Sequence, residues 1–274
     1  MSKGASHLLG RKAGVRLAGF HNVMGAVLAS EAGFDGLWAS GFAFSASLGL
    51  ADSNFVPPNQ VASMCALVSR RVKLPILVDF DTGYGGAEQA RYFAELFQSV
   101  GCKGLCIEDK TFPKNNSYSD KPNSLEEVED CQKKISAIKQ HCGREFVVVA
   151  RTEALVLGRG VELALNRASA FVDAGADAVL VHSKSNVPDE VQAFCNDWGR
   201  DAPVFAIPTT YPSASYDSLR KIGVYGCIYA NQGLRASYAA MASVLRQIVD
   251  ERTSEHVEQK LTPVDVILRY QDRL

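Results

Sequence analysis

Short apolar runs alternate with amphipathic segments along the whole chain. Each run spans three to five residues, and polar or glycine-containing stretches separate it from the next. The runs are Leu17–Phe20, Gly36–Ala39, Ile76–Val78, Leu105–Ile107, Phe146–Ala150, Ala178–Val181, Val204–Ile207 and Cys227–Ala230. Because they are continuously apolar rather than alternating, we expect eight strands buried on both faces, as in a parallel sheet covered by helices.

Helical spacing of apolar residues fills several of the intervals between these runs. The clearest segments are Ala87–Val100, Ser124–His141, Val161–Ala174 and Leu234–Val249. Eight strand–helix units predict an α/β fold, one (β/α)8 TIM barrel domain over residues 1–274. An open doubly wound sheet is the alternative, although no Gly-x-Gly-x-x-Gly motif follows the first run. The amphipathic segment Leu261–Leu274 predicts an extra C-terminal helix, a kind of element that often packs on another subunit.

Composition narrows the possible partners and compartment. The 274 residues include 29 basic and 30 acidic ones, for a net charge of −1, and no basic stripe interleaved with aromatic residues is present. We therefore expect no nucleic-acid partner. No apolar run approaches the roughly 20 residues that cross a bilayer, and residues 1–20 lack the apolar core of a signal peptide. Seven cysteines, mostly inside apolar segments, indicate reduced thiols and a soluble, cytoplasmic protein.

Polar residues follow most of the predicted strands. In a barrel, catalytic groups lie at the carboxyl ends of the strands, so we expect these residues to meet at one mouth. In chain order they are Ser40-Gly41-Phe42, Asp79 and Asp81, Glu108 and Asp109, Arg151 and Glu153, His182 and Ser183, Thr209, and Asn231.

Four of the acids in this region form a candidate metal site. They are Asp52, Asp79, Asp81 and Glu108. Carboxylates without nearby thiolates or paired histidines favour Mg2+, or Mn2+, over zinc. Because Mg2+ keeps several waters, we expect Asp79 to be the direct ligand and the other acids to hold metal-bound water. The alternative is that the acids cap helices or pair with Arg151, Lys110 or Lys114.

Donors for an anionic substrate lie on the later strands and in one loop. Arg151 and His182 suit a phosphoryl group or a carboxylate, although Arg151 could instead form a salt bridge with Glu153 or Glu108, and His182 could be a core residue. The segment Lys114–Ser117 offers a cation, two amides and a hydroxyl that could close over an anion. Its alternative interpretation is a solvated surface loop.

The residues after the second strand allow two interpretations as well. The backbone N–H groups of Gly41 and Phe42 could face an enolate oxygen, or the glycine could simply allow a turn. Trp38, taken alone, is more typical of a core residue than of a ligand contact.

Six motifs in this order resemble the phosphoenolpyruvate mutase branch of the isocitrate lyase superfamily. The motifs are Trp38–Phe42, Leu50–Asn54, Asp79–Gly85, Glu108–Lys114, Ala150–Ala154 and His182–Lys184. The resemblance implies an (α/β)8 barrel whose last helix is exchanged between subunits, so that a homo-oligomer forms from dimers that pair into tetramers. It also implies Mg2+ and a small anionic substrate.

Within this superfamily the loop at Lys114–Ser117 separates the activities. Carbon–carbon lyases carry a cysteine there, which this chain lacks. The mutase pattern is Lys-x-Asn-Ser, and the hydrolase pattern resembles Lys-x-Thr-Ser. Asn116 therefore favours a phosphoenolpyruvate mutase, which interconverts phosphoenolpyruvate and phosphonopyruvate in phosphonate biosynthesis. Phosphonopyruvate hydrolase is the alternative, and a non-catalytic barrel that binds or scaffolds is the third possibility.

The resemblance also assigns roles to individual residues. The catalytic residues would be Asp52, Asn116, Arg151 and His182. The substrate would contact Trp38, Ser40, Gly41, Phe42, Asp79, Lys114, Asn116, Ser117, Arg151 and His182. Thr152 stands where the family often has valine, and Ala39 and Phe42 differ from some members. The size of the substrate therefore stays open, and a carboxylated relative of phosphoenolpyruvate is a further possibility.

Overall fold

The computed structural model describes residues 8–272 and contains a closed barrel of eight parallel strands in sequential order, with β8 paired to β1. The strands are β1 (Val15–Phe20), β2 (Gly36–Ala39), β3 (Ile76–Asp79), β4 (Gly104–Glu108), β5 (Val147–Thr152), β6 (Ala178–Val181), β7 (Val204–Ala206) and β8 (Val224–Tyr229). Each overlaps one of the eight predicted runs. The (β/α)8 prediction is confirmed, and the open-sheet alternative is wrong.

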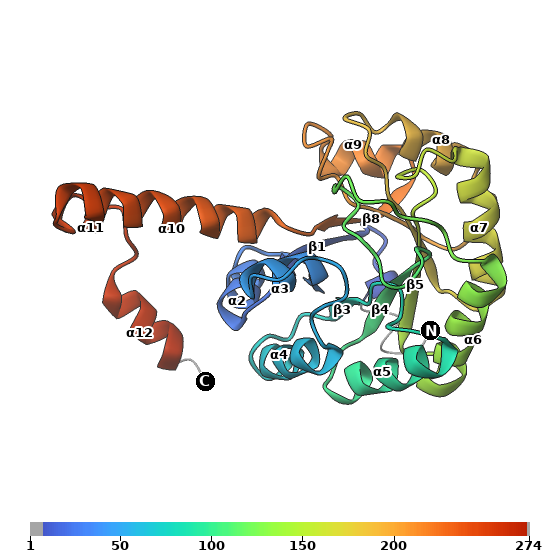
Figure 1. The fold of residues 1–274 in the computed structure, drawn as a ribbon, viewed down its shortest axis with the longest axis horizontal. Helices are drawn as coiled ribbons and strands as arrows, with labels where there is room; N and C mark the ends of the chain where they lie inside the picture. The colour runs from blue at the N-terminus through green and yellow to red at the C-terminus, as the bar shows by residue number, and fades with distance from the viewer. Residues whose placement is uncertain (1–7, 273–274) are drawn as a thin grey trace. The chain divides into compact units, whose positions relative to one another are not determined.

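Helices cover the outside of the barrel (Figure 1). They are α2 (Val23–Glu31), α3 (Gly41–Ser47), α4 (Pro58–Arg71), α5 (Ala87–Ser99), α6 (Val128–Cys142), α7 (Val161–Asp173), α8 (Asp189–Asp197) and α9 (Tyr216–Lys221). The helix predicted from Ser124 begins only at Val128. The reason is that Leu125 forms an isolated antiparallel bridge with Lys110, which holds the chain extended before the helix.

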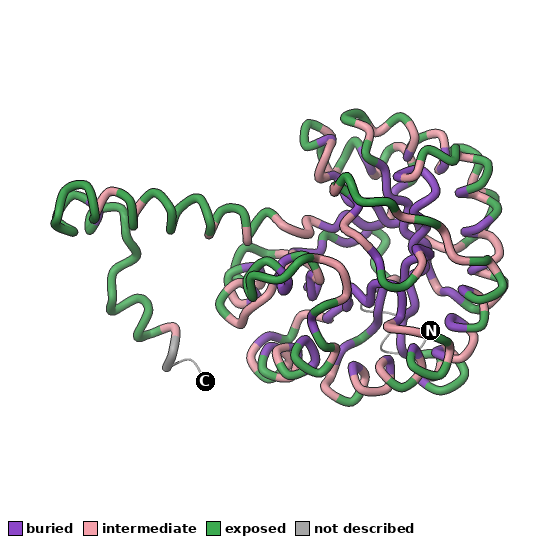
Figure 2. The backbone as a smooth tube through the Cα atoms, viewed as in Figure 1, coloured by how far each residue is buried: buried purple, intermediate pink, exposed green. Residues whose placement is uncertain are grey.

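The strands are buried on both faces, as their continuous apolar sequences predict (Figure 2). Side chains such as Leu17, Leu77 and Phe205 fill the interior, so the barrel is a packed core rather than a pore. Gly226 is needed for this packing, because a Cβ at that position would lie 2.3 Å from the ring of Phe205. The polar residues at the strand ends are therefore supported by a tightly packed core.

The chain divides into two compact units, Met1–Asn231 with the barrel and Gln232–Leu274. The second unit contains α10 (Gln232–Glu251), α11 (Glu255–Glu258) and α12 (Val264–Asp272). α10 and α12 correspond to the helices predicted at Leu234–Val249 and Leu261–Leu274, and residues 273–274 lie outside the described part. A single domain over 1–274 stays a prediction. Within residues 8–272 no helix is both long and apolar enough to cross a membrane.

Candidate active site

Lys114 forms ion pairs with two of the predicted metal-site acids. It lies in the loop between β4 and α6 (residues 109–127, the β4–α6 loop). Its Nζ lies 3.0 Å from Asp52 Oδ1 and 2.7 Å from Asp81 Oδ1, and the lysine is only 5% exposed. Asn116 Nδ2 donates to Asp52 Oδ2 at 2.6 Å. The alternative of a solvated surface loop is therefore wrong for this segment, which folds onto the acids.

Asn54 completes this part of the site, and the sequence analysis did not select it. Its Nδ2 donates to Asp81 Oδ2 at 2.9 Å, and its Oδ1 accepts from the Lys114 backbone N–H at 2.8 Å. Asn54 and Asp81 both have left-handed backbone conformations, with φ of 61° and 49°. Such conformations cost free energy and persist where surrounding contacts enforce them. The position of Asn54, two residues after Asp52, was the available signal.

Asp79 ends β3 and faces the start of α3. Its Oδ2 accepts from the Gly41 backbone N–H at 3.1 Å. A Cβ on Gly41 would lie 3.3 Å from Asp79 Oδ2 and 3.2 Å from Asp81 Oδ1, so both acids border the same small space. Gly41 thus allows a close approach of the two carboxylates, and no unusual φ is involved. The Gly41 N–H expected to face an enolate oxygen is directed at a carboxylate in this structure.

The other residues predicted after β2 have different surroundings. Ser40 Oγ accepts from the Ala43 N–H at 3.3 Å and so caps α3. Phe42 is 38% exposed, whereas Trp38 is 1% exposed among the interior side chains of the barrel. Trp38 Nε1 has no hydrogen-bond partner, which leaves a donor available in the core. The structure therefore places Trp38 where the core interpretation had it.

Burial and charge oppose each other in the acidic cluster. Burial raises the pKa of Asp79, and it raises that of Asp81 to about 7. Burial also acts to raise the pKa of Asp52, but the charge of Lys114 and the hydrogen bond from Asn116 outweigh this effect, so the pKa of Asp52 is lowered. These carboxylates therefore ionise together at neutral pH only when enough positive charge lies beside them.

A second cluster surrounds Glu153, which was predicted among the polar residues at the mouth and as a possible salt-bridge partner of Arg151. Glu153 is fully buried and forms a very short contact with Arg151 Nε. Its carboxylate also lies 2.9 Å from His182 Nδ1 and accepts from Ser117 Oγ at 2.7 Å. Lys110 Nζ lies 3.6 Å from Glu153 and donates to Ser117 Oγ at 2.9 Å. Arg151, His182 and Ser117 thus meet, as predicted, and Arg151 also forms the predicted pair with Glu153.

The charge states in this cluster follow from its contacts. Burial opposes ionisation of Glu153, but the charges of Arg151 and Lys110 and the hydrogen bond with His182 hold its pKa well below the usual range. Burial lowers the pKa of His182, although Glu153 acts in the opposite direction, so the imidazole is neutral near pH 7. His182 Nε2 lies 3.1 Å from the Tyr118 hydroxyl, a contact that the sequence analysis missed. Tyr118 directly follows the predicted loop motif, which was the only sequence signal for it.

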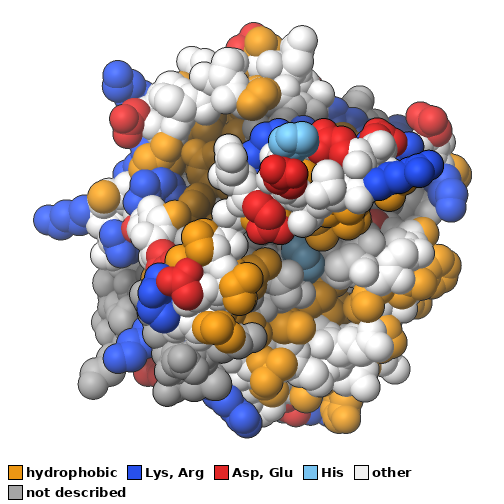
Figure 3. Space-filling model, turned by 90° about the vertical axis from the view of Figure 1, so that its left-hand side faces the viewer, with side chains coloured by type: hydrophobic (Ala, Val, Ile, Leu, Met, Phe, Trp, Pro, Cys, Tyr) orange, Lys and Arg blue, Asp and Glu red, His pale blue; other side chains and the backbone are white. Residues whose placement is uncertain are grey.

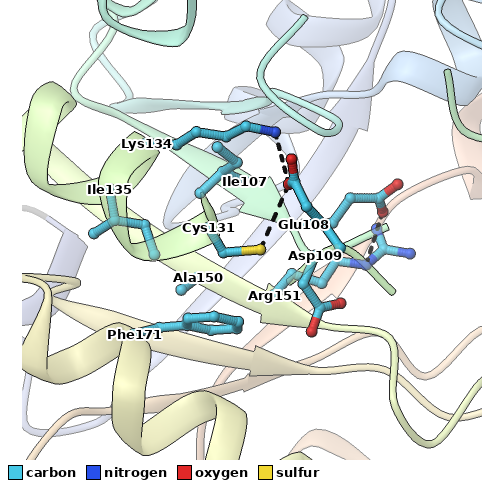
Figure 4. Close-up of a pocket in the computed structure, with 10 residues that line it drawn as sticks. Ile107, Glu108, Asp109, Cys131, Lys134, Ile135, Ala150, Arg151 and Phe171 are labelled. Atoms are coloured by element: carbon cyan, nitrogen blue, oxygen red, sulfur yellow. Dashed lines mark hydrogen bonds and ion pairs between the residues drawn. The ribbon is translucent and has the colours of Figure 1, made fainter. Parts of the chain in front are cut away.

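A buried ionic network lies behind these groups, and Figure 4 shows three of its residues, Asp109, Lys134 and Arg151, at one pocket. Asp109 Oδ1 accepts from the Glu153 backbone N–H at 2.8 Å, and its Oδ2 pairs with Arg167 Nε at 2.7 Å. Lys134, on α6, lines the pocket shown in Figure 4 and donates to the Thr82 carbonyl oxygen at 3.0 Å. α6 and α7 therefore hold the backbone on which Asp81 and Glu153 are placed.

The donors at the mouth fit a hard divalent cation. Both Glu108 carboxylate oxygens are buried without a hydrogen bond, although Lys110 Nζ and Arg151 Nε lie 3.3 and 3.4 Å away. Asp79 and Asp81 border the same space. Within the described residues, no three acidic, histidine or cysteine side chains are arranged as ligands of one ion. With at most one or two of these carboxylates as direct ligands, a cation bound here would keep several waters, as Mg2+ usually does.

Proteins of one known family match this chain in sequence and in fold. A family model described as phosphoenolpyruvate phosphomutase matches residues 6–249. The phosphoenolpyruvate phosphomutase of Tetrahymena pyriformis is 40% identical over 253 residues, which are 92% of this chain and 84% of that protein. The crystal structure of the phosphoenolpyruvate phosphomutase from Streptomyces platensis subsp. rosaceus is 36% identical with a TM-score of 0.95, over 98% of this chain and 94% of that chain. A phosphonopyruvate hydrolase in complex with oxalate and Mg++ is 34% identical with a TM-score of 0.91, over 99% and 95% of the two chains.

Proposed function

The chain belongs to the phosphoenolpyruvate phosphomutase family, and on that premise we propose that it is an isomerase that interconverts phosphoenolpyruvate and phosphonopyruvate. The observation that carries the choice is Asn116, whose Nδ2 donates to Asp52 Oδ2 at 2.6 Å. An amide there can donate to a phosphoryl group and fill the space above it. The reaction would form the C–P bond in phosphonate biosynthesis.

Mg2+ is the proposed cofactor, with Mn2+ as a substitute. Asp79 would bind it directly, and Asp81, Glu108 and Asp52 would hold its water ligands. The bound cation would supply positive charge to the enolate oxygen of the pyruvyl group. The raised pKa values of Asp79 and Asp81 support this proposal, because a cation favours their ionised forms. The likeness to a hydrolase that was crystallised with oxalate and Mg++ supports it further.

The phosphoryl group is held by side chains from the later strands. Arg151 Nη2 lies 2.8 Å from His182 Nδ1, and Arg151 would bind the phosphoryl oxygens together with Asn116. His182, whose ring nitrogens face Glu153 and Tyr118, would hold Arg151 and the loop in place. If the transition state is loose and metaphosphate-like, catalysis consists mainly of positioning these donors and excluding water. Asp52, next to Asn116, would guide the migrating group electrostatically or act as a nucleophile. Ser40, Phe42 and Trp38 remain proposed substrate contacts on family grounds.

Phosphonopyruvate hydrolase is the second candidate, because the hydrolase structure is nearly as similar to this chain as the mutase structure is. In that reaction water takes the place of the enolate oxygen as phosphoryl acceptor. The Lys114-Asn115-Asn116-Ser117 loop favours the mutase. Its contacts with Asp52 and Glu153 would help to keep water from the phosphoryl group.

We also propose a homo-oligomer, a dimer or a tetramer, in which the C-terminal helices are exchanged between subunits. Tyr238, Met241, Leu245 and Val249 recur every three or four residues on α10, and each is more than half exposed. Figure 3 shows exposed hydrophobic side chains between charged ones on one face of the molecule. An unpartnered apolar stripe of this kind is typical of a subunit interface. The seven free cysteines support a cytoplasmic location.

Phosphorus NMR tests the proposed reaction. The protein is mixed with phosphonopyruvate and Mg2+, and the products are followed over time. The mutase predicts growth of a phosphoenolpyruvate resonance. Inorganic phosphate as the only product would establish the hydrolase instead, and no product with Mg2+ or Mn2+ would favour a non-catalytic barrel.

A further inference from the structure

Tyr118 connects the β4–α6 loop to the side of the mouth formed by the later strands. Its hydroxyl lies 3.1 Å from His182 Nε2, and the two rings meet edge-on with centroids 5.8 Å apart. The Thr209 side chain acts to lower the pKa of the same hydroxyl, as a hydrogen-bond donor does, and Asn231 Nδ2 lies 3.5 Å from Thr209 Oγ1. Tyr118 therefore contacts groups that follow β6 and β7.

The preceding residues of the loop are attached to other parts of the rim. Lys114 and Asn116 bind Asp52, which follows β2. Ser117 donates to Glu153, which follows β5. The loop thus extends across the mouth, and Tyr118 is attached at the end that lies nearest β6 and β7.

The hydrogen bonds at Tyr118 are consistent in direction. If the Thr209 hydroxyl donates to the phenol oxygen, the phenol proton is left to donate to His182 Nε2. His182 Nδ1 can then donate to Glu153, which is 2.9 Å away, and in this tautomer it accepts no hydrogen bond from Arg151 Nη2, which lies 2.8 Å from the same nitrogen. These bonds are between neutral groups, except for the last. The bonds of Lys114 and Asn116 involve a carboxylate and are stronger, so the loop opens more easily at Tyr118.

We propose that Tyr118 is a positioning residue that sets the reaction specificity by fastening the β4–α6 loop to His182 and keeping water from the migrating phosphoryl group. This inference rests on the proposed mutase function. In isomerisation the C–P bond breaks and a P–O bond forms to the enolate oxygen. When water enters, its oxygen bonds to phosphorus instead, one of its protons goes to the enolate carbon, and the products are pyruvate and phosphate. A fastened loop favours the first outcome.

The ratio of phosphate to phosphoenolpyruvate formed from phosphonopyruvate, measured by phosphorus NMR, tests this role. Tyr118→Phe keeps the ring and removes the hydroxyl, and we expect the ratio to rise about three- to tenfold, the effect of one neutral hydrogen bond. Thr209→Val should raise the ratio in the same direction. The double variant should change it by less than the product of the two single effects, because both residues act through one chain of bonds. Tyr92→Phe, on the exposed face of α5, is the matched control and should leave the ratio unchanged.

Hydrogen–deuterium exchange of peptides from residues 111–125 measures loop opening without substrate. We expect exchange to be about three- to tenfold faster in Tyr118→Phe and unchanged in Tyr92→Phe. Phosphate as the sole product of the wild-type protein would overturn the proposed function itself. An unchanged product ratio in Tyr118→Phe, from a wild type that forms phosphoenolpyruvate, would overturn the role of Tyr118 alone, whether or not exchange becomes faster.

Discussion

Replacing Glu153 with glutamine should destabilise the protein strongly, although the two side chains have nearly the same size. Glu153 is fully buried and is the acceptor for Arg151, His182 and Ser117. The amide removes the charge and leaves Arg151 with only the more distant Glu108, at 3.4 Å, as its carboxylate partner within the site. Breaking a buried ion pair by removing one partner costs about 3–5 kcal/mol. For a chain of this size the melting temperature should fall by roughly 6 to 20 °C.

Calorimetry or thermal denaturation by circular dichroism at pH 7 measures this difference. Glu95→Gln is the matched control, because Glu95 Oε1 lies 3.0 Å from Arg91 Nη1 but its side chain is 41% exposed. An exposed pair of this kind contributes about 0.5 kcal/mol or less. If Glu153→Gln lowers the melting temperature no more than Glu95→Gln does, the assignment of Glu153 as the central anion of the cluster is wrong.

The same variant has a predicted pH dependence. The pKa of Glu153 lies well below its usual value in the folded protein, so the carboxylate stabilises the fold fully above its unfolded pKa of about 4.3. This stabilisation is lost only as the pH falls through the depressed folded value. The gap between wild type and Glu153→Gln should therefore persist from pH 8 to pH 5 and narrow in stronger acid. A gap that closes between pH 7 and pH 5 would contradict the depressed pKa.

Three further outcomes follow from the site. Gly41→Ala places a methyl group 3.2 Å from Asp81 Oδ1. The variant should lower kcat/KM about tenfold or more with little change in melting temperature. An unchanged kcat/KM would contradict the conclusion that this methyl group disturbs the carboxylates. Asn116→Thr should raise the fraction of phosphate among the products, and an unchanged fraction would remove the argument from the loop. Oxalate, an enolate mimic, should raise the melting temperature by roughly 5 °C or more only together with Mg2+; an equal rise without Mg2+ would argue against a metal-dependent site.

The positions of the strands could be predicted from the sequence because burial on both faces leaves a distinct local pattern. Continuous apolar runs such as Phe146–Ala150 can be read without knowing what packs around them. The polar residues at their ends were found in the same way. The start of α6 was predicted too early, because the bridge between Lys110 and Leu125 depends on residues that approach only in the folded chain.

The pairing of the acids with Lys114, and of Arg151 with Glu153 or Glu108, was predicted only as an alternative, and the local sequence does not say which pairs form. Lys114 lies 62 positions after Asp52, and nothing in the intervening sequence indicates that they meet. In the closed barrel each acid is buried, and an unpaired buried charge is costly, so each acid pairs with the nearest cation. The same reasoning explains why Asn54 and Tyr118 were missed. Each acts through contacts with residues far away in the sequence, which no periodicity records.

The most direct test of the account is the fate of phosphorus in phosphonopyruvate, measured by phosphorus NMR for the wild-type protein and for Asp79→Ala side by side. The account predicts that phosphoenolpyruvate forms with the wild type in the presence of Mg2+ and fails to form with Asp79→Ala. Wild-type conversion to phosphate alone, or equal formation of phosphoenolpyruvate by both proteins, would contradict it.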